Sequence, residues 1–372
     1  MDWSQYGLKE IPFMAVPAIR INSRDKRING ELYYSKFATR ELEQMTKFIE
    51  TEAFPWLFLQ TSGEVLGNGK SAFMAYIYRN LEKKKKNVLW AEARNDPRLT
   101  NLLAQMLDAF VSEGKLEQVK RKIGPINSQG IKEQLSKFPL FTYGYKTIQA
   151  LDQLLNVKDE EIVRTFSNIK KSNPTLNHGE MFGAIIHLFY ACGGLRFTIF
   201  IDQFEEYVLS HKGSEEKIKF GHELNDLFRE IGDTVTFVVS THPRVTNELI
   251  ANSPEADTFT RVDAASVQLP LMTRDDLENM VVLYLRAFRV EGFQKDKFYP
   301  FQEDVIQYSA ERTGLNPRNL ILALRSAMLY GALEKFATID EGFLLKNHNQ
   351  IFGGLENKWK DFKEGKWTHK TI

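Results

Sequence analysis

The sequence predicts an α/β protein with a three-layer parallel sheet, followed by a helical domain. Short apolar segments of strand length alternate with longer segments of helical periodicity, an order that favours parallel strands joined by helical crossovers. The first apolar segment leads through a glycine-rich turn into a helix, and the last is followed by a mainly helical stretch. The apolar segments are 56–60, 87–93, 197–202, 234–240 and 266–272.

The glycine-rich turn has the composition of a phosphate-binding loop. It reads Gly67-Asn68-Gly69-Lys70-Ser71, and apolar residues recur at helical spacing after it. Glycines let successive backbone N–H groups close around phosphate oxygens, the lysine reaches the outer phosphates, and the serine hydroxyl holds Mg²⁺. We therefore expect Gly67, Asn68, Gly69, Lys70 and Ser71 to bind ATP, with Ser71 also a ligand of Mg²⁺.

The overall composition is that of an ordinary globular protein. The chain has 372 residues, of which 43% are hydrophobic, enough for one large core and a smaller one. No apolar run approaches the ~20 residues that span a bilayer, so we expect a cytoplasmic protein without membrane contact. The single cysteine, Cys192, excludes an internal disulfide and is expected in the core. A net charge of +1 means that nucleic-acid binding requires a local basic patch.

The first fifty residues begin irregularly and end in a helix. The helix is expected over 39–50, where Thr39 precedes acidic residues of the first turn. Three aromatic residues precede it: Tyr6, Phe13 and Phe37. Packing is the favoured role for all three, and contact with the adenine base is the alternative.

The strand 197–202 ends in an aspartate, Asp202, as in P-loop enzymes that hold Mg²⁺ through water. We expect Asp202 to order Mg²⁺ opposite Ser71. Glu205 and Glu206 follow, and Glu205 is the first candidate for orienting the attacking water. The alternative is that both glutamates are a surface pair at a helix start, where the helix dipole favours acidic residues.

Two later positions are candidates for sensing the nucleotide. His242 follows strand 234–240, where a polar side chain is expected beside the γ-phosphate; a neutral histidine hydrogen-bonded to a loop is the alternative. Asn316 and Pro317 are expected to open a helix, because proline is favoured in a first helical turn. That start places Arg318 on the first turn.

The order of segments predicts three parts. Residues 1–272 form the nucleotide-binding core, in which a block at about 96–187 reads as several helices inserted between two strands. Residues 273–348 form a helical lid, and 349–372 form a basic tail. Lysines alternate with aromatic residues in the tail, which suits nucleic acid or a partner, although a solvated helix is the commoner explanation.

Taken in order, these motifs resemble those of the AAA+ superfamily, over most of residues 35–345. The segment 67–71 looks like Walker A, FTIFIDQFEE looks like Walker B, VVSTHPR looks like the sensor-one strand, and GLNPRNL looks like the sensor-two helix of a lid. Within the superfamily the chain looks closest to the initiator and transposition-regulator clade. The opening YGLKEIPF is similar to a motif of bacterial ExeA-type ATPases, and DQFEE is similar to the wording of STAND signalling ATPases.

This resemblance implies ATP and Mg²⁺ as cofactors and Mg²⁺-dependent ATP hydrolysis. It puts His242 at sensor one and Arg318 at sensor two. Arg261 occupies the place of an arginine finger that completes a neighbour's site, which implies a homo-oligomer assembled through its ATP sites. Two departures from the family pattern, Glu64 in Walker A and Gln203 after Walker B, are compatible with slow hydrolysis and hence with a switch.

The expected function is an ATP-hydrolysing switch that acts on DNA or on a DNA-processing partner. The alternative is a STAND-like signalling or scaffold protein that binds nucleotide tightly with little turnover and uses the helical block to bind proteins. A third possibility, a P-loop kinase, is disfavoured because the sensor and lid pattern leaves no evident acceptor pocket.

Overall fold

A computed structural model describes most of the chain and confirms the α/β fold. The remaining residues, including most of 205–263, lie outside the described part. The described residues are 2–52, 55–61, 67–92, 99–112, 114–123, 126–138, 143–173, 176, 178–193, 196–204, 231, 234–242 and 264–363.

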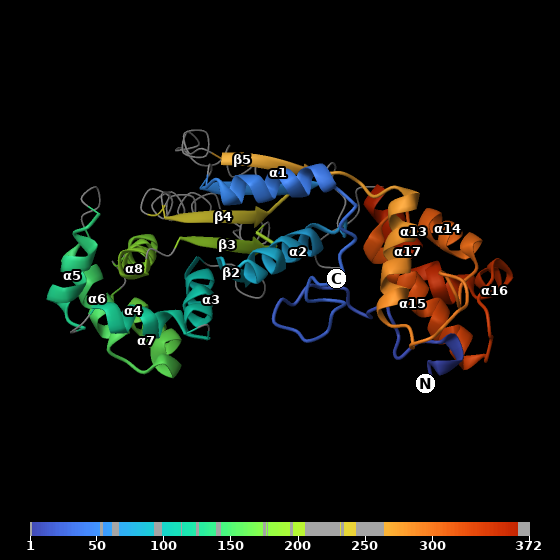
Figure 1. The fold of residues 1–372 in the computed structure, drawn as a ribbon, viewed down its shortest axis with the longest axis horizontal. Coiled ribbons are helices and arrows are strands. Elements are labelled where there is room, and N and C mark those ends of the chain that lie inside the picture. The colour runs from blue at the N-terminus through green and yellow to red at the C-terminus, as the bar shows by residue number, and fades with distance from the viewer. Residues whose placement is uncertain are drawn as a thin grey trace. The chain divides into compact units, whose positions relative to one another are not determined.

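Five strands form one sheet in the order β2-β3-β4-β1-β5 (Figure 1). The pairings of β2 with β3, β3 with β4, and β4 with β1 are parallel. Every residue of β1, β3 and β4 is buried, which explains why these strands read as uninterrupted apolar runs. The strands are β1 (Trp56–Thr61), β2 (Asn87–Glu92), β3 (Phe197–Asp202), β4 (Val235–Ser240) and β5 (Ala264–Leu269).

The helical insertion lies between β2 and β3, as predicted. Its aromatic side chains join the core of the sheet: the ring of Phe110 stacks on Phe189 at 4.2 Å and meets Phe197 of β3 edge-on at 4.9 Å. Cys192 is buried there too, also as predicted. The helices are α3 (Leu99–Ser112), α4 (Lys115–Ile123), α5 (Ser128–Leu135), α6 (Tyr145–Leu155), α7 (Ile162–Ser172) and α8 (His178–Gly193).

The C-terminal region is helical, and its first helix begins with a capping box. The Thr273 side chain accepts from the backbone N–H of Asp276, whose carboxylate accepts from the Thr273 N–H in return. The helices are α13 (Arg274–Ala287), α14 (Glu303–Arg312), α15 (Pro317–Leu333), α16 (Glu341–Lys346) and α17 (His348–Lys363). Earlier in the chain stand α1 (Thr39–Glu50), with the predicted bounds, and α2 (Lys70–Lys83).

One strand prediction is wrong at its C-terminal end. The fifth strand was expected over 266–272, but β5 ends at Leu269. Pro270 follows, and proline has no N–H to donate to a neighbouring strand. The apolar residues after it therefore belong to the connection that leads to α13.

The chain divides into two compact units. One comprises Met1–Leu42, Thr61–Arg79 and Leu269–Ile372, and the other comprises Glu43–Gln60 and Asn80–Gln268. The phosphate loop and the first part of α2 therefore group with the N-terminal segment and the C-terminal helices. Within the described residues, every helix is too short or too polar to cross a bilayer.

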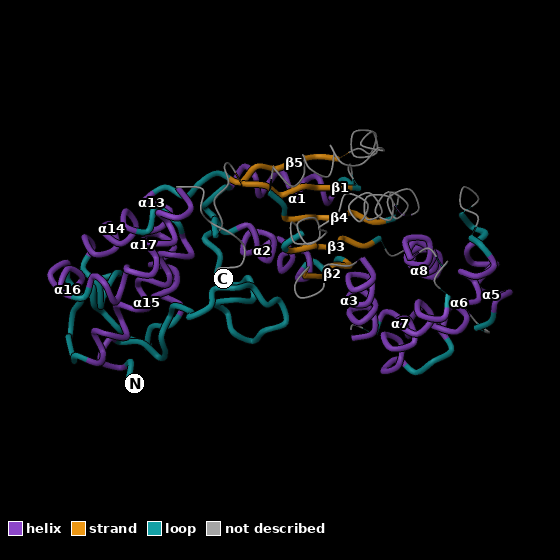
Figure 2. The backbone as a smooth tube through the Cα atoms, turned by 180° about the vertical axis from the view of Figure 1, so that it is seen from behind, coloured by secondary structure: helices purple, strands orange, loops and turns teal. Residues whose placement is uncertain are grey.

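The N-terminal segment, residues 2–38, packs against the C-terminal helices (Figures 1 and 2). Tyr6 and Phe13 are fully buried and Phe37 is 3% exposed, in agreement with packing. The Tyr6 hydroxyl donates to the carbonyl of Phe336, which follows α15, at 3.0 Å. Arg325 of α15 donates to the Phe13 carbonyl at 2.7 Å.

The same segment also reaches the helix that follows the phosphate loop. Arg79 of α2 donates through Nε to the carbonyl of Asn29 at 3.1 Å. The Tyr33 ring stacks on Tyr76 with centroids 5.0 Å apart and meets Phe73 edge-on at 5.9 Å. Residues 2–38 thus contact both the phosphate-loop helix and the C-terminal helices within one unit.

Candidate nucleotide-binding site

The phosphate loop has the backbone conformation that its glycines predict. Gly67 has φ +87° and Gly69 has φ +88°, in the left-handed region that residues with side chains rarely adopt. Helix α2 begins directly afterwards, and the N–H of Phe73 donates to the Gly69 carbonyl at 2.9 Å. Because a helix leaves its first N–H groups without intrahelical acceptors, its N-terminus attracts anions.

Among the described residues, the space beside the second glycine is open. A Cβ atom placed on Gly69 would meet none of their atoms within 4 Å, although the neighbouring residue Asn68 is only 6% exposed. A left-handed backbone at a helix start with room beside it suits the close approach of a phosphate group. The residues present therefore fit a nucleotide phosphate.

The first turn of α15 lies against the phosphate loop, within the same unit. A Cβ atom on Gly67 would stand 3.0 Å from the Cβ of Arg318 and 3.0 Å from the Oδ1 of Asn316. The stem of Arg318 thus packs on the loop backbone. The structure therefore brings together the loop and the arginine expected at sensor two.

Asn316 makes a second contact with the loop. Its Oδ1 accepts from the N–H of Asn319 at 3.1 Å and so caps α15, while its Nδ2 lies 3.5 Å from the Oδ1 of Asn68. Both asparagine side chains are buried. Among the described residues, the Nδ2 of Asn68 has no hydrogen-bond acceptor. The sequence indicated Asn316 as a helix cap and missed its contact with the loop.

Asp202 is the last residue of β3 and is 1% exposed. Its Oδ1 accepts from the hydroxyl of Ser240 at 2.8 Å and from the N–H of Gln203 at 3.0 Å. The Gln203 N–H also lies 2.9 Å from the Ser240 hydroxyl oxygen. Ser240 ends the neighbouring strand β4, so a cross-strand contact fixes the carboxylate at the carboxyl end of the sheet. Sequence reasoning did not single out Ser240.

Gln203 takes an unusual backbone conformation, with φ +59°. It begins a turn, and the N–H of the buried Phe204 donates to the Ser240 carbonyl at 3.2 Å. A non-glycine residue in the left-handed region costs energy, so surrounding contacts must hold it there. Gln203, which departs from the Walker B pattern, thus lies in the turn that is hydrogen-bonded to Ser240.

His242 lies just beyond β4, half-buried. The preceding Thr241 is fully buried, and its N–H donates to the Leu59 carbonyl of β1 at 3.0 Å. This bond extends the pairing of β4 with β1 up to the residue before His242. Four residues singled out from the sequence lie outside the described part of the chain: Glu64, Glu205, Glu206 and Arg261.

The residue types suit Mg²⁺ bound as P-loop proteins bind it. No three His, Cys, Asp or Glu side chains of the described residues come together as a ready-made metal site. Mg²⁺ in nucleotide sites needs only one or two protein ligands, because phosphates and waters supply the others. The hydroxyl of Ser71 and the carboxylate of Asp202 are each of a type that can supply such a ligand.

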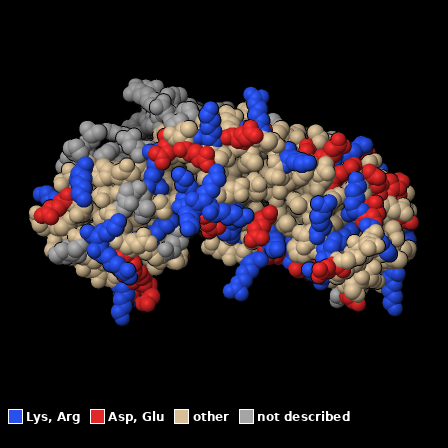
Figure 3. All heavy atoms as spheres, viewed as in Figure 1, with Lys and Arg blue, Asp and Glu red and all other residues tan. Residues whose placement is uncertain are grey.

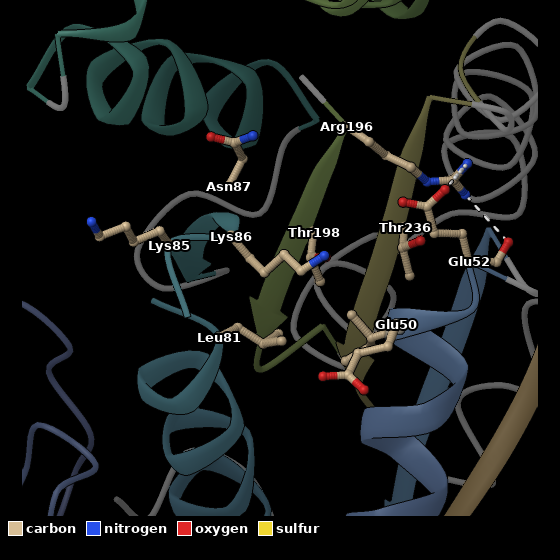
Figure 4. Close-up of a pocket in the computed structure, with 10 residues that line it drawn as sticks. Glu50, Glu52, Leu81, Lys85, Lys86, Asn87, Arg196, Thr198 and Thr236 are labelled. Carbon is tan, nitrogen blue, oxygen red and sulfur yellow. Dashed lines mark hydrogen bonds and ion pairs between the residues drawn. The ribbon is translucent and has the colours of Figure 1, made fainter. Parts of the chain in front are cut away.

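A polar pocket of about 190 Å³ lies at the opposite, amino ends of the strands (Figure 4). Thr198 and Thr236, near the starts of β3 and β4, line it together with charged residues from the ends of α1 and α2. Arg196 pairs with Glu52 at 3.3 Å, and Lys84 beside the pocket pairs with Glu50 at 2.6 Å. The charged residues that line the pocket are two glutamates and three cations, Lys85, Lys86 and Arg196, so its lining carries a small excess of positive charge.

Among the described residues, the surface charge on the face shown in Figure 3 is of both signs. Basic and acidic side chains both occur across the whole width of that face. This distribution agrees with the net charge of +1. Charge on that face therefore gives no argument for or against a nucleic-acid partner.

The parallel sheet with its helical insertion, the phosphate loop and the capped helix beside it make up an AAA+-type fold. The structure of the Aeropyrum pernix ORC2 protein in ADPNP-ADP complexes has a TM-score of 0.51 and 11% sequence identity, and the match covers 94% of this chain and 74% of that one. The crystal structure of Cdc6p from Pyrobaculum aerophilum has a TM-score of 0.51 and 10% sequence identity. That match covers 95% of this chain and 72% of the other.

At these identities the similarity establishes the fold, and it confirms the AAA+-type fold expected from the motifs. No protein-family model matches the chain, and no curated protein matches it in sequence. The placement near ExeA-type ATPases stays a prediction.

Proposed function

We propose that this protein is an ATP-binding and ATP-hydrolysing molecular switch that acts on DNA or on a DNA-processing partner. The observation that carries the proposal is the contact of the phosphate loop with the first turn of α15. Gly67 touches both Asn316 and Arg318, so a phosphate on the loop would lie next to a cationic side chain of the helical region. In this proposal residues 273–348 act as the lid.

In this site the loop residues Gly67 to Ser71 hold the phosphates and Lys70 neutralises the outer ones. Ser71 and Asp202 would hold Mg²⁺, which when bound offsets charge that develops on the phosphate oxygens. The Ser240 hydroxyl keeps the Asp202 carboxylate at the strand end. Glu205, with Glu206 as the neighbouring candidate, is proposed to orient the attacking water.

Two further residues are proposed to respond to the nucleotide. His242, at the end of β4, is proposed to contact the γ-phosphate region. Arg261 is proposed to complete the site of a neighbouring copy, which makes the active form a homo-oligomer. DNA as the target is supported by the resemblance of the motif order to the initiator clade.

The test is ATP turnover by the purified chain with and without double-stranded DNA, beside Lys70→Ala and Glu205→Gln variants. We expect Mg²⁺-dependent turnover that both substitutions abolish and that DNA raises, with the DNA effect weakening steeply as salt increases. Tight ATP binding without turnover would replace the enzyme by a nucleotide-gated scaffold. Turnover that is indifferent to DNA would overturn the DNA part of the proposal.

A further inference from the structure

Asn316 occupies a position where one side chain performs two tasks. Its carbonyl oxygen caps α15 by accepting from Asn319, and its amino group faces the carbonyl oxygen of Asn68. Residues 68 and 316 are 248 positions apart in sequence, and both side chains are buried, at 6% and 3% exposure. The helix cap alone would be satisfied by a shorter hydroxyl side chain.

The contact between the two asparagines is incomplete in this state. A distance of 3.5 Å is long for an N–H···O bond, whose usual range is about 2.7–3.2 Å. The amino group of Asn68 is buried without an acceptor among the described residues, which costs about 1–3 kcal/mol. A phosphate oxygen in the loop is the kind of acceptor that the proposed function would supply.

The neighbouring residues turn this contact into control over Arg318. Pro317 stands between Asn316 and Arg318 in the chain, is buried, and holds the backbone at the first position of α15. The stem of Arg318 then rests on Gly67. A shift of Asn316 away from the loop would therefore carry Arg318 with it.

We infer that Asn316 is a positioning residue of the nucleotide site: by contacting Asn68 it holds the start of α15 against the phosphate loop and thereby places Arg318 for the γ-phosphate. This inference rests on the proposed function and goes beyond it, because it gives the lid a second, uncharged link to the loop. This link is a contact between Asn316 and the loop residue Asn68, so it forms without the γ-phosphate.

The test is a double-mutant cycle with Asn316→Ser and Asn68→Ala, read as affinities for ATP and ADP in Mg²⁺. Serine retains the helix cap and removes the amino group. We expect each single variant to bind ATP about 3–10-fold more weakly, with a smaller loss for ADP because Arg318 serves the γ-phosphate. The double variant is expected to lose no more ATP affinity than the single variant that binds ATP more weakly, since the effects of residues in contact are not additive.

A second measurement uses the protein without nucleotide. Asn68→Ala removes a buried amino group that lacks an acceptor, so overall stability is expected to be unchanged or higher. Amide hydrogen exchange at residues 319–321 is nevertheless expected to rise, although the substitution lies outside α15. Asn127→Ser is the matched control: Asn127 caps α5 by accepting from Gly130 at 2.8 Å and belongs to the other unit.

The outcomes separate the inference from the proposed function. Unchanged ATP affinity in Asn316→Ser, or additive losses in the double variant, would reduce Asn316 to a helix cap and overturn the inference. Unchanged exchange at residues 319–321 in Asn68→Ala would do the same without any nucleotide. If the parent protein fails to bind ATP, the proposed function fails, whereas the exchange experiment still decides whether the link exists.

Discussion

Gly67→Ala is expected to destabilise the protein through two separable costs. A residue with a side chain at φ +87° loses about 1–2 kcal/mol relative to glycine. The new Cβ would also stand 3.0 Å from Arg318 Cβ and from Asn316 Oδ1, so the loop or α15 must move. Overpacking of this kind costs about 1–3 kcal/mol, which brings the total to about 2–5 kcal/mol.

Gly69→Ala is the matched control. Its φ of +88° lies in the same left-handed region, whereas its Cβ would meet no atom of the described residues within 4 Å. Urea unfolding of both variants without nucleotide therefore isolates the contact with α15. We expect the alanine at 67 to cost about 1–3 kcal/mol more than the alanine at 69. Equal losses in the two variants would refute the contact between loop and helix.

Three further predictions concern stability. Phe13→Ala should cost about 3–5 kcal/mol in urea unfolding, because the ring is fully buried among the C-terminal helices, and a loss below 1 kcal/mol would contradict that packing. Burial raises the pKa of Tyr6 and of Tyr284 to about 12, so their contribution to the unfolding free energy should be fully present below pH 10 and be lost between pH 10 and 12. Unfolding measured at pH 9, 10 and 11 checks this, and an unfolding free energy that does not change with pH would exclude it. Ser240→Ala should lower the unfolding free energy by about 1–3 kcal/mol, since the buried Asp202 carboxylate loses a donor, and a thermal midpoint equal to the parent's would argue against that bond.

The sequence predicted those elements whose signal is local. Strand β3 has the predicted bounds because a strand buried on both faces is an uninterrupted apolar run. The start of α15 followed from an asparagine cap before a proline. Within the predicted helical block, α5 has a weak local signal because it has only eight residues, including a glycine in its first turn.

The contacts that shape the site could not be predicted because they join distant parts of the chain. Nothing local in residues 2–38 indicates that Phe13 lies against α15, since the segment is irregular and has no apolar period. The contact of Asn316 with Asn68 likewise cannot be read from the sequence. The only signal for it is that both asparagines lie in predicted functional motifs. Residue types can be read from the sequence, whereas the fold determines which of them lie in contact.

Titration of the purified protein with ATP in the presence of Mg²⁺, beside Lys70→Ala, tests the central claim most directly. We expect one saturable site per chain in the parent. The variant should bind about 10–100-fold more weakly, because the charge-assisted hydrogen bond of a lysine is worth about 1.5–3 kcal/mol. Absence of binding in the parent, or equal affinity in the two proteins, would contradict the assignment of residues 67–71 as the nucleotide site.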